Sequence, residues 1–225
     1  YYLVYPGDTP PSDNGAVPGP PLLQYASAPE NSIAVLPFSN LSESSEDEYL
    51  ADGLAEEILN VLVRVSQLKV AARTSSFHYK GKNEDIRTIA AQLGVRKILE
   101  GSVRRAGNKL RVTAQLINAS DGFHLWSQTY DRGTDDIFAI QDEIATKVVD
   151  ALQLVLTEAS AQALTAGGTK NVSAYDYYLK GRAYLRQPVS SETAQRAEEL
   201  FENALTLDPD FARAYAGLCE TYLLW

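Results

Sequence analysis

Apolar positions between residues 32 and 72 follow two different spacings. The runs SIAVLPF at 32–38 and LKVAA at 68–72 have the length and the flanking residues of buried strands. Between them, apolar residues recur every three or four positions as far as Val65. Ser45 with Glu48 three residues later is a capping-box signal for the start of that helix. This part of the chain is therefore predicted to form a strand, a helix and a second strand.

The pattern changes after the polar stretch TSSFHYKGKN at 74–83, which we expect to be a loop. Helical spacing returns at 86–93 and ends at Gly94. Turn signals at 106–108 and 121–122 then divide residues 95–132 into a three-stranded antiparallel meander. Thr134 can cap a long helix over 135–159. Residues 32–160 are thus predicted to be an α+β domain, a mixed sheet with an antiparallel meander covered by helices.

The last segment, 173–225, has the spacing of an all-α tetratricopeptide repeat array. Small, aromatic, small and proline residues fall at the positions of the second helix of a repeat, and a second set restarts the pattern after residue 210. One complete unit and the start of another are predicted, joined to the α+β domain by a linker at 161–172. We expect Cys219 to be a small buried group at a packing position. The residues that carry the pattern are Gly181, Tyr184, Ala197, Phe201, Ala204, Pro209, Tyr215, Leu218 and Tyr222.

The amino-terminal 31 residues differ from the rest. Residues 6–31 hold seven of the ten prolines, which predicts an extended, semi-rigid linker of up to roughly 70 Å. Residues 1–5, YYLVY, suit the end of a membrane span, because tyrosine is favoured at the lipid interface. The alternative is a tail left by signal cleavage.

Charge narrows the classes of partner. The formal net charge of −9 argues against broad attraction to nucleic acid, so only the local basic stretch 101–116 could bind phosphates. In that stretch Leu110 and Val112 alternate with Arg111 and Thr113, which is the pattern of a half-buried strand. We interpret its cations as a solvated sheet face suited to protein docking, with nucleic-acid binding as the less favoured alternative. The single cysteine allows no intrachain disulfide.

The α+β and helical segments resemble a known family, the TolB amino-terminal-like domain of bacterial membrane-anchored regulators and adenylate cyclase-related proteins, followed by tetratricopeptide repeats. The resemblance implies an extracytoplasmic sensing or docking part that one membrane span links to a DNA-binding or cyclase domain. Neither of those domains lies within these residues, so the resemblance implies a location and a class of role, and no reaction. It rests on SIAVLPFSNLS at 32–42, EYLADGLAEEI at 48–58, ARTSSFHYKGK at 72–82, the block 93–132, DIFAIQDEIA at 136–145, AYDYYLKGRAYL at 174–185 and FENALTLDPDFARAYAGL at 201–218.

Few residues suggest catalysis. His78 and His124 have no nucleophile motif near them, and no glycine-rich phosphate loop is present in the sequence. The acidic run at 43–48 lacks the spacing of a calcium loop and suits the start of a helix. We therefore expect no enzymatic activity, no cofactor and no metal site.

Contact with a partner protein is the better-supported use of the surface. Aromatic and basic residues in a loop can form a contact site, although Phe77 can instead fill the core beneath the sheet, and Trp126 and Tyr130 on the last strand pose the same choice. The first helix of a tetratricopeptide repeat lines a groove that commonly receives peptides. The candidate protein-binding residues are Phe77, Tyr79, Arg104, Arg105, Tyr178, Arg182 and Arg186.

The sequence thus predicts a non-catalytic protein-protein interaction module of a membrane-anchored bacterial protein. Its place would be the periplasmic side of the inner membrane, anchored by a segment before Tyr1, with envelope or membrane proteins as partners in sensing or scaffolding. Two alternatives remain: an accessory structural subunit of a membrane complex, and a sensor that holds a small ligand between sheet and repeats.

Overall fold

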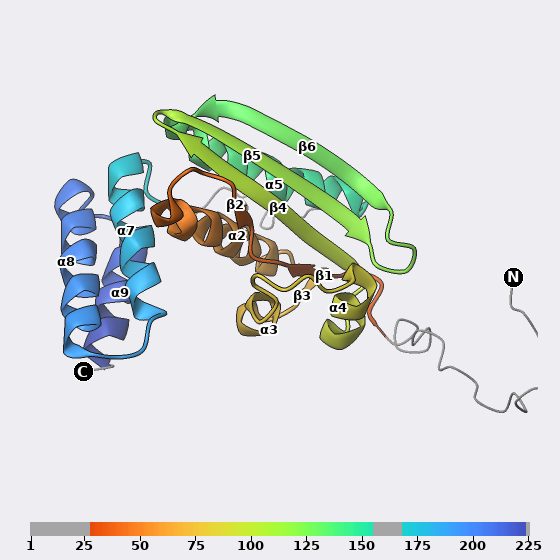
Figure 1. The fold of residues 1–225 in the computed structure, drawn as a ribbon, viewed down its shortest axis with the longest axis horizontal. Helices are drawn as coiled ribbons and strands as arrows, with labels where there is room; N and C mark the ends of the chain where they lie inside the picture. The colour runs from red at the N-terminus through yellow and green to blue at the C-terminus, as the bar shows by residue number, and fades with distance from the viewer. Residues whose placement is uncertain (1–27, 155–167, 224–225) are drawn as a thin grey trace, which may run out of the picture.

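A mixed sheet forms the centre of the computed structural model, which describes residues 28–154 and 168–223 (Figure 1). The strand order is β3-β1-β4-β5-β6, and the short β2 pairs with β4 outside this path. β1 is parallel to β3 and β4, whereas β4, β5 and β6 form an antiparallel meander. The α+β fold class with a meander is therefore confirmed. The strands are β1 (Ser32–Val35), β2 (Ser39–Asn40), β3 (Lys69–Val70), β4 (Lys97–Ala106), β5 (Lys109–Asn118) and β6 (His124–Gly133).

Helices pack on both faces of the sheet. α2 (Glu48–Val63) and α5 (Ile137–Ala151) cover one face, where Leu54, Ile58 and Ile144 join the main hydrophobic core. α4 (Ile86–Leu93) covers the other face near β1, through a smaller apolar cluster that includes Ile89 and Ile98. The meander beyond β4 keeps an open face, because Arg111 on β5 is exposed while its neighbours Leu110 and Val112 are buried. This alternation confirms the half-buried strand that the sequence predicts.

Several helix ends differ from the sequence-based expectation. Ser44, one residue before the predicted Ser45, caps a 3-10 turn, η1 (Ser45–Asp47), by accepting a hydrogen bond from the Glu46 amide. Thr134 is not a cap: it begins a second 3-10 turn, η2 (Thr134–Asp136), before α5. α5 ends at Ala151, and the predicted remainder of that helix lies largely outside the described residues. The predicted loop at 74–83 begins within the short helix α3 (Arg73–Phe77), because the chain turns as soon as it leaves β3.

Three further helices, α7 (Val172–Leu185), α8 (Ser191–Leu207) and α9 (Ala212–Leu223), pack together at one end of the molecule (Figure 1). Their centre is the buried ring of Phe201, which Gly181 and Gly217 allow to approach: a Cβ at these two positions would lie 2.8 and 2.5 Å from ring atoms. Cys219 is exposed, so the expectation of a buried packing residue is wrong. The tetratricopeptide assignment of these helices stays a prediction.

The predicted ends of the chain are described only in part. Residues 1–5 and most of the linker at 6–31 lie outside the described residues, as do residues 161–167 of the second linker, and Val172 already belongs to α7. Within the described part of the chain, no helix has the length and apolar character needed to cross a bilayer.

Gly94 offers a local test of the fold. It ends α4 in the left-handed region with φ 64°, a conformation that glycine adopts without steric cost. Replacing Gly94 with alanine should lower the free energy of unfolding by about 1 kcal/mol, because the added Cβ is disfavoured at this φ although the space around it is open. Urea unfolding followed by circular dichroism measures the change, and an unchanged stability would contradict the assigned backbone conformation.

Candidate functional site

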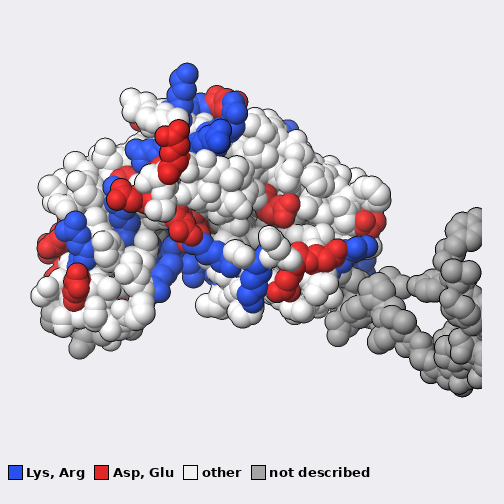
Figure 2. Space-filling model, in the orientation of Figure 1, with Lys and Arg blue, Asp and Glu red and all other residues white. Residues whose placement is uncertain are grey.

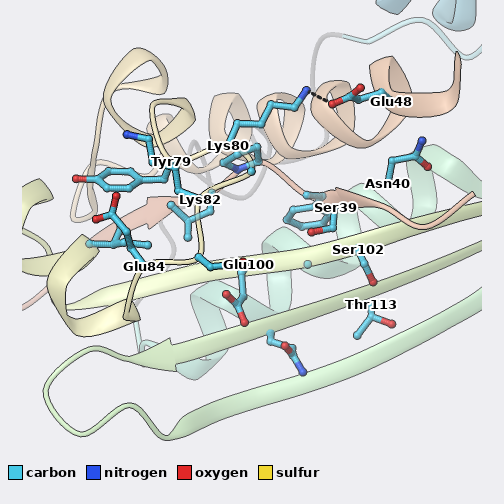
Figure 3. Close-up of a pocket in the computed structure, with 18 of the residues that line it drawn as sticks. Ser39, Asn40, Glu48, Tyr79, Lys80, Lys82, Glu84, Glu100, Ser102 and Thr113 are labelled. Carbon is cyan, nitrogen blue, oxygen red and sulfur yellow. Dashed lines mark ion pairs between the residues drawn. The ribbon is translucent and has the colours of Figure 1, made fainter. Parts of the chain in front are cut away.

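A polar cleft lies beside the carboxyl end of β1, where the chain passes from β1 to β2 (Figure 3). Ligands of open α/β sheets commonly bind at the carboxyl ends of parallel strands. The cleft has a volume of about 830 Å³, within the range of small-molecule sites. One wall is the 79–84 loop after α3, and the floor is the open face of β4 and β5.

Four polar side chains form the floor of the cleft. Glu100 and Ser102 of β4 lie opposite Gln115 and Thr113 of β5 in the strand register. Gly101 between them lacks a side chain because a Cβ there would lie 2.8 Å from the Phe38 ring and would also collide with the Thr113 carbonyl oxygen. The sequence therefore places backbone and an aromatic ring in close contact beneath a hydrogen-bonding surface.

Glu100 is the acid of this floor. Burial raises the pKa of its carboxyl group, and the nearby His124 partly opposes that rise. Among the described residues its side chain has no hydrogen-bond or ion-pair partner. An acid in this setting can accept a proton or receive a donor from a bound molecule.

The raised pKa of Glu100 predicts a defined pH dependence of stability. The pKa of Glu100 is raised above 4.5 in the folded state, so the folded state binds this proton more tightly than the unfolded state does. The contribution of protonated Glu100 to stability is therefore lost as pH rises through the folded pKa. Glu100→Gln removes this titration, and the variant should gain stability relative to the native chain between acid and neutral pH. Urea midpoints from pH 4 to pH 8 measure the difference; a gap that stays constant over this range would contradict the assignment.

The cations of the cleft already have partners. Lys80 lies 2.7 Å from both Glu48 and Asp52, and the Lys82 ammonium lies 2.7 Å from Nε2 of His78. Tyr79 is buried in the smaller apolar cluster and donates its hydroxyl to Oε1 of Gln92 at 2.5 Å. Tyr79 is thus a core residue, and the expectation that it offers an exposed aromatic contact is wrong.

Phe77 also packs inward. Its ring contacts the main core and is half-buried, with the Arg73 guanidinium 4.1 Å from the ring centroid. Trp126 and Tyr130 likewise lie on the core side of β6, where Tyr130 is buried. All four aromatic candidates on the α+β domain therefore pack against a hydrophobic core.

Charged side chains join the α+β domain to the helical segment. Glu56 of α2 accepts from Nε of Arg73 at 2.8 Å and from Arg182 of α7 at 3.1 Å, and it also binds Arg186. Burial alone would raise the pKa of Glu56, but the three guanidinium groups lower it overall. A second pair, Glu57 with Arg213, connects α2 to α9. We call these six residues the junction cluster.

The junction cluster changes the interpretation of three candidate residues. Arg182 and Arg186 hold α7 against α2, where sequence reasoning expected them to contact a partner. Tyr178 is buried beside Phe201 and Phe211 and offers no surface to a groove. Arg182 and Arg186 thus fix the position of α7 on α2, and Tyr178 packs within the helical segment.

A groove runs along the other side of this junction. It has a volume of about 700 Å³ and continues into a hollow of about 350 Å³ beside Arg105 and Lys180. We call it the junction groove. The three tyrosines that line it, Tyr49, Tyr177 and Tyr184, are partly exposed. The Tyr49 hydroxyl donates to Asp176, and Nη1 of Arg105 lies 3.4 Å from the same hydroxyl oxygen. Its aromatic and cationic lining residues are Tyr49, Tyr177, Tyr184, Arg105, Lys180 and Arg196.

Sequence reasoning found one of these six groove residues, Arg105. Tyr49 lies on a helix of one domain and Tyr177 on a helix of the other, and no spacing rule connects residues about 130 positions apart. Their partial exposure follows from how α7 is docked on α2. The available signal was tyrosine in each of these helical stretches, because its apolar ring and polar hydroxyl suit a half-exposed position.

A catalytic arrangement is not evident in the part of the chain that the structure describes. His78 contacts Lys82, and His124 lies near Glu100, with no serine, cysteine or threonine nucleophile hydrogen-bonded to either ring. No group of three or more histidine, cysteine, aspartate or glutamate residues in this part could hold a metal ion.

Comparison with known proteins gives a family, a relative in sequence and similar solved structures. Residues 29–147 match the family described as the second domain of HilA/YgeH-like transcriptional regulators. A protein of Rhizobium meliloti (strain 1021) named "Putative adenylate cyclase 3" is 45% identical over 187 residues, which are 83% of this chain and 32% of that protein. The chain thus spans about a third of this relative.

Two solved structures match part of the chain at low identity. TolB of Acinetobacter baumannii matches with a TM-score of 0.40 and 17% identity, over 56% of this chain and 30% of that one. The carboxyl-terminal domain of LpoB from Salmonella enterica matches with a TM-score of 0.39 and 18% identity, over 48% and 84%.

Proposed function

Because this chain belongs to the family of HilA/YgeH-like transcriptional regulator second domains, we propose that it is a non-catalytic protein-protein interaction module of a membrane-anchored bacterial protein. Its role would be sensing or scaffolding on the periplasmic side of the inner membrane. The proline-rich segment supports the tethered arrangement, since such a spacer holds a domain away from its anchor. A membrane span before Tyr1 is part of this proposal.

The junction groove is the observation that carries the proposal. Tyrosine and arginine are enriched in protein interfaces, where they combine a large contact area with hydrogen-bonding groups. Here three tyrosines and three cations line one concave surface that both domains build. Because the junction cluster holds α7 against α2, this surface is preorganised, which lowers the entropy cost of binding.

The relationship to a protein named as an adenylate cyclase fits a non-catalytic role within a larger chain. The matched region is about a third of that protein, so a catalytic domain can lie elsewhere in it. We propose that this chain corresponds to a docking part and that α7, α8 and α9 are tetratricopeptide helices. The close packing of Gly181 and Gly217 on Phe201 supports the repeat assignment.

Affinity purification of the full-length, tagged protein from bacterial membranes tests the proposal. Tyr184→Ala in the junction groove should remove co-purifying envelope proteins, whereas Tyr222→Ala, a 57% exposed tyrosine on α9, should leave them bound. Recovery of the tagged protein from the cytosol, or equal co-purification with both variants, would count against it. Partners present in fixed stoichiometry under all growth conditions would favour the accessory-subunit alternative.

The polar cleft favours a second candidate function, the sensing of a small ligand. Its volume and its floor of carboxyl, hydroxyl and amide groups suit a polar molecule. Thermal-shift measurements with envelope metabolites test this, and a ligand bound in the cleft should stabilise the native chain more than Glu100→Gln. Equal stabilisation of both proteins would place the ligand elsewhere.

A further inference from the structure

Three cations share the open face of the sheet where β4 turns into β5. Arg104 lies directly opposite Arg111 in the strand register, and Lys109 follows opposite Ala106. Arg104 and Lys109 are exposed, and the Arg111 side chain is 57% exposed. Like charges directly opposite each other on neighbouring strands are destabilising. We call Arg104, Lys109 and Arg111 the basic triad.

The acids nearby neutralise only part of this charge. Asp131 of β6 accepts from Nε and Nη2 of Arg111 at 2.6 and 3.0 Å. Nε of Arg104 donates to the Leu41 carbonyl at 3.0 Å, and Lys109 has no ion pair among the described residues. One carboxylate thus serves three cations. Figure 2 shows Lys and Arg side chains gathered at this end of the sheet, with acidic ones beside them.

The basic triad also lines a concave surface. A hollow of about 700 Å³ is bounded by these three residues, by Asp131 and Arg132 of β6, and by residues at the turn between β4 and β5. Guanidinium groups bind carboxylates through two parallel hydrogen bonds, and the terminal nitrogens of Arg104 are free of protein acceptors within the described residues. The hollow therefore combines a concave surface with positive charge that protein carboxylates only partly neutralise.

We propose that the basic triad binds an acidic segment of a partner protein, with two carboxylates of an extended stretch placed over Arg104, Lys109 and Arg111. This inference rests on the proposed interaction function and names a second contact surface for it. A second carboxylate at this position would relieve the repulsion between Arg104 and Arg111, so binding recovers a cost that the free protein carries.

The number of cations favours an acidic protein segment over the two other anionic partners, nucleic acid and membranes. A nucleic acid would have to approach a chain of net charge −9 through the three cations of the triad, one of which is already paired with Asp131. Anionic membranes are bound by clusters of roughly four to eight basic residues. A short acidic segment needs only as many cations as the triad offers.

Fluorescence anisotropy of the 225-residue chain with a labelled Glu-Ser-Glu-Ser-Glu-Ser peptide at low salt tests the proposal. Arg104→Gln should weaken binding about tenfold, because one charge-assisted partner is lost. Arg87→Gln is the matched control, since it removes an exposed arginine on α4 that pairs with Asp85. Arg104→Gln should also raise the thermal unfolding midpoint slightly, because it removes the repulsion between Arg104 and Arg111. A raised midpoint with weaker binding shows that the variant is folded. Lys109→Gln is a second variant that should also weaken binding of the peptide.

Three results would overturn the proposal: no binding of the peptide at low salt, equal weakening by Arg104→Gln and Arg87→Gln, or tighter Arg104-dependent binding of a 12-base-pair DNA duplex or of vesicles with 30% anionic lipid. None of these affects the Tyr184→Ala comparison in the junction groove. Failure of this inference and failure of the proposed function are therefore distinguishable.

Discussion

Replacing Glu56 with alanine should lower the free energy of unfolding by about 3 kcal/mol. Its carboxylate, 9% exposed, is the shared acceptor for Arg73, Arg182 and Arg186, so its removal leaves three guanidinium groups close together without their acid. Breaking a buried pair costs about 3–5 kcal/mol, and the lower end applies because the arginines keep some access to water. Urea unfolding followed by circular dichroism measures the loss.

Glu199→Ala is the matched control for Glu56→Ala. Glu199 pairs with Arg196 on the surface of α8, with both side chains more than half exposed, so its loss should cost less than about 1 kcal/mol. If the two variants lost equal stability, the junction cluster would not hold the helices to the α+β domain. The junction groove would then lack the preorganisation that its proposed role requires.

Replacing Phe201 with alanine should cost about 3–5 kcal/mol and should affect the helical segment first. The ring is fully buried between α7, α8 and α9, and Gly181 and Gly217 have no side chains that could move into the space it leaves. The cavity therefore persists. Hydrogen exchange should show lost protection in 172–223 ahead of the meander strands, because α8 packs on α7 and α9 whereas the meander strands pack against α2 and α5.

Tyr222→Ala on α9 is the control for Phe201→Ala. Tyr222 is 57% exposed, so this substitution removes an aromatic ring from the same helices without opening a cavity. We expect its effect on the unfolding midpoint to be small. Uniform loss of protection across the whole chain in Phe201→Ala would mean that the helices and the sheet unfold as one unit.

Local patterns predicted the sheet well. The alternation of Leu110 and Val112 with Arg111 identifies the buried face of β5, and Gly94 marks a helix end, because each signal acts between residues close in sequence. The helix starts were less accurate. Ser44 and Ser45 are both competent caps, and tertiary packing decided between them by placing a 3-10 turn before α2.

Site residues were predicted less well because their roles depend on distant partners. Arg182 and Arg186 fit a peptide groove by repeat position, yet Glu56, more than 120 residues earlier, binds both. Tyr79 stands in a polar stretch, and the short helix α3 turns it into the smaller apolar cluster. Nothing in the local sequence distinguishes an arginine that docks a helix from one that contacts a partner.

Site-specific photo-crosslinking in living bacteria tests the central claim most directly. A photoreactive residue at Gln187, exposed in the junction groove, should give a discrete adduct with an envelope protein, and Arg105→Ala should weaken that adduct. The same residue at Lys147, exposed on α5 outside the groove, should give none. Adducts of equal yield at both positions, or no adduct at Gln187, would contradict a protein-binding role for the groove.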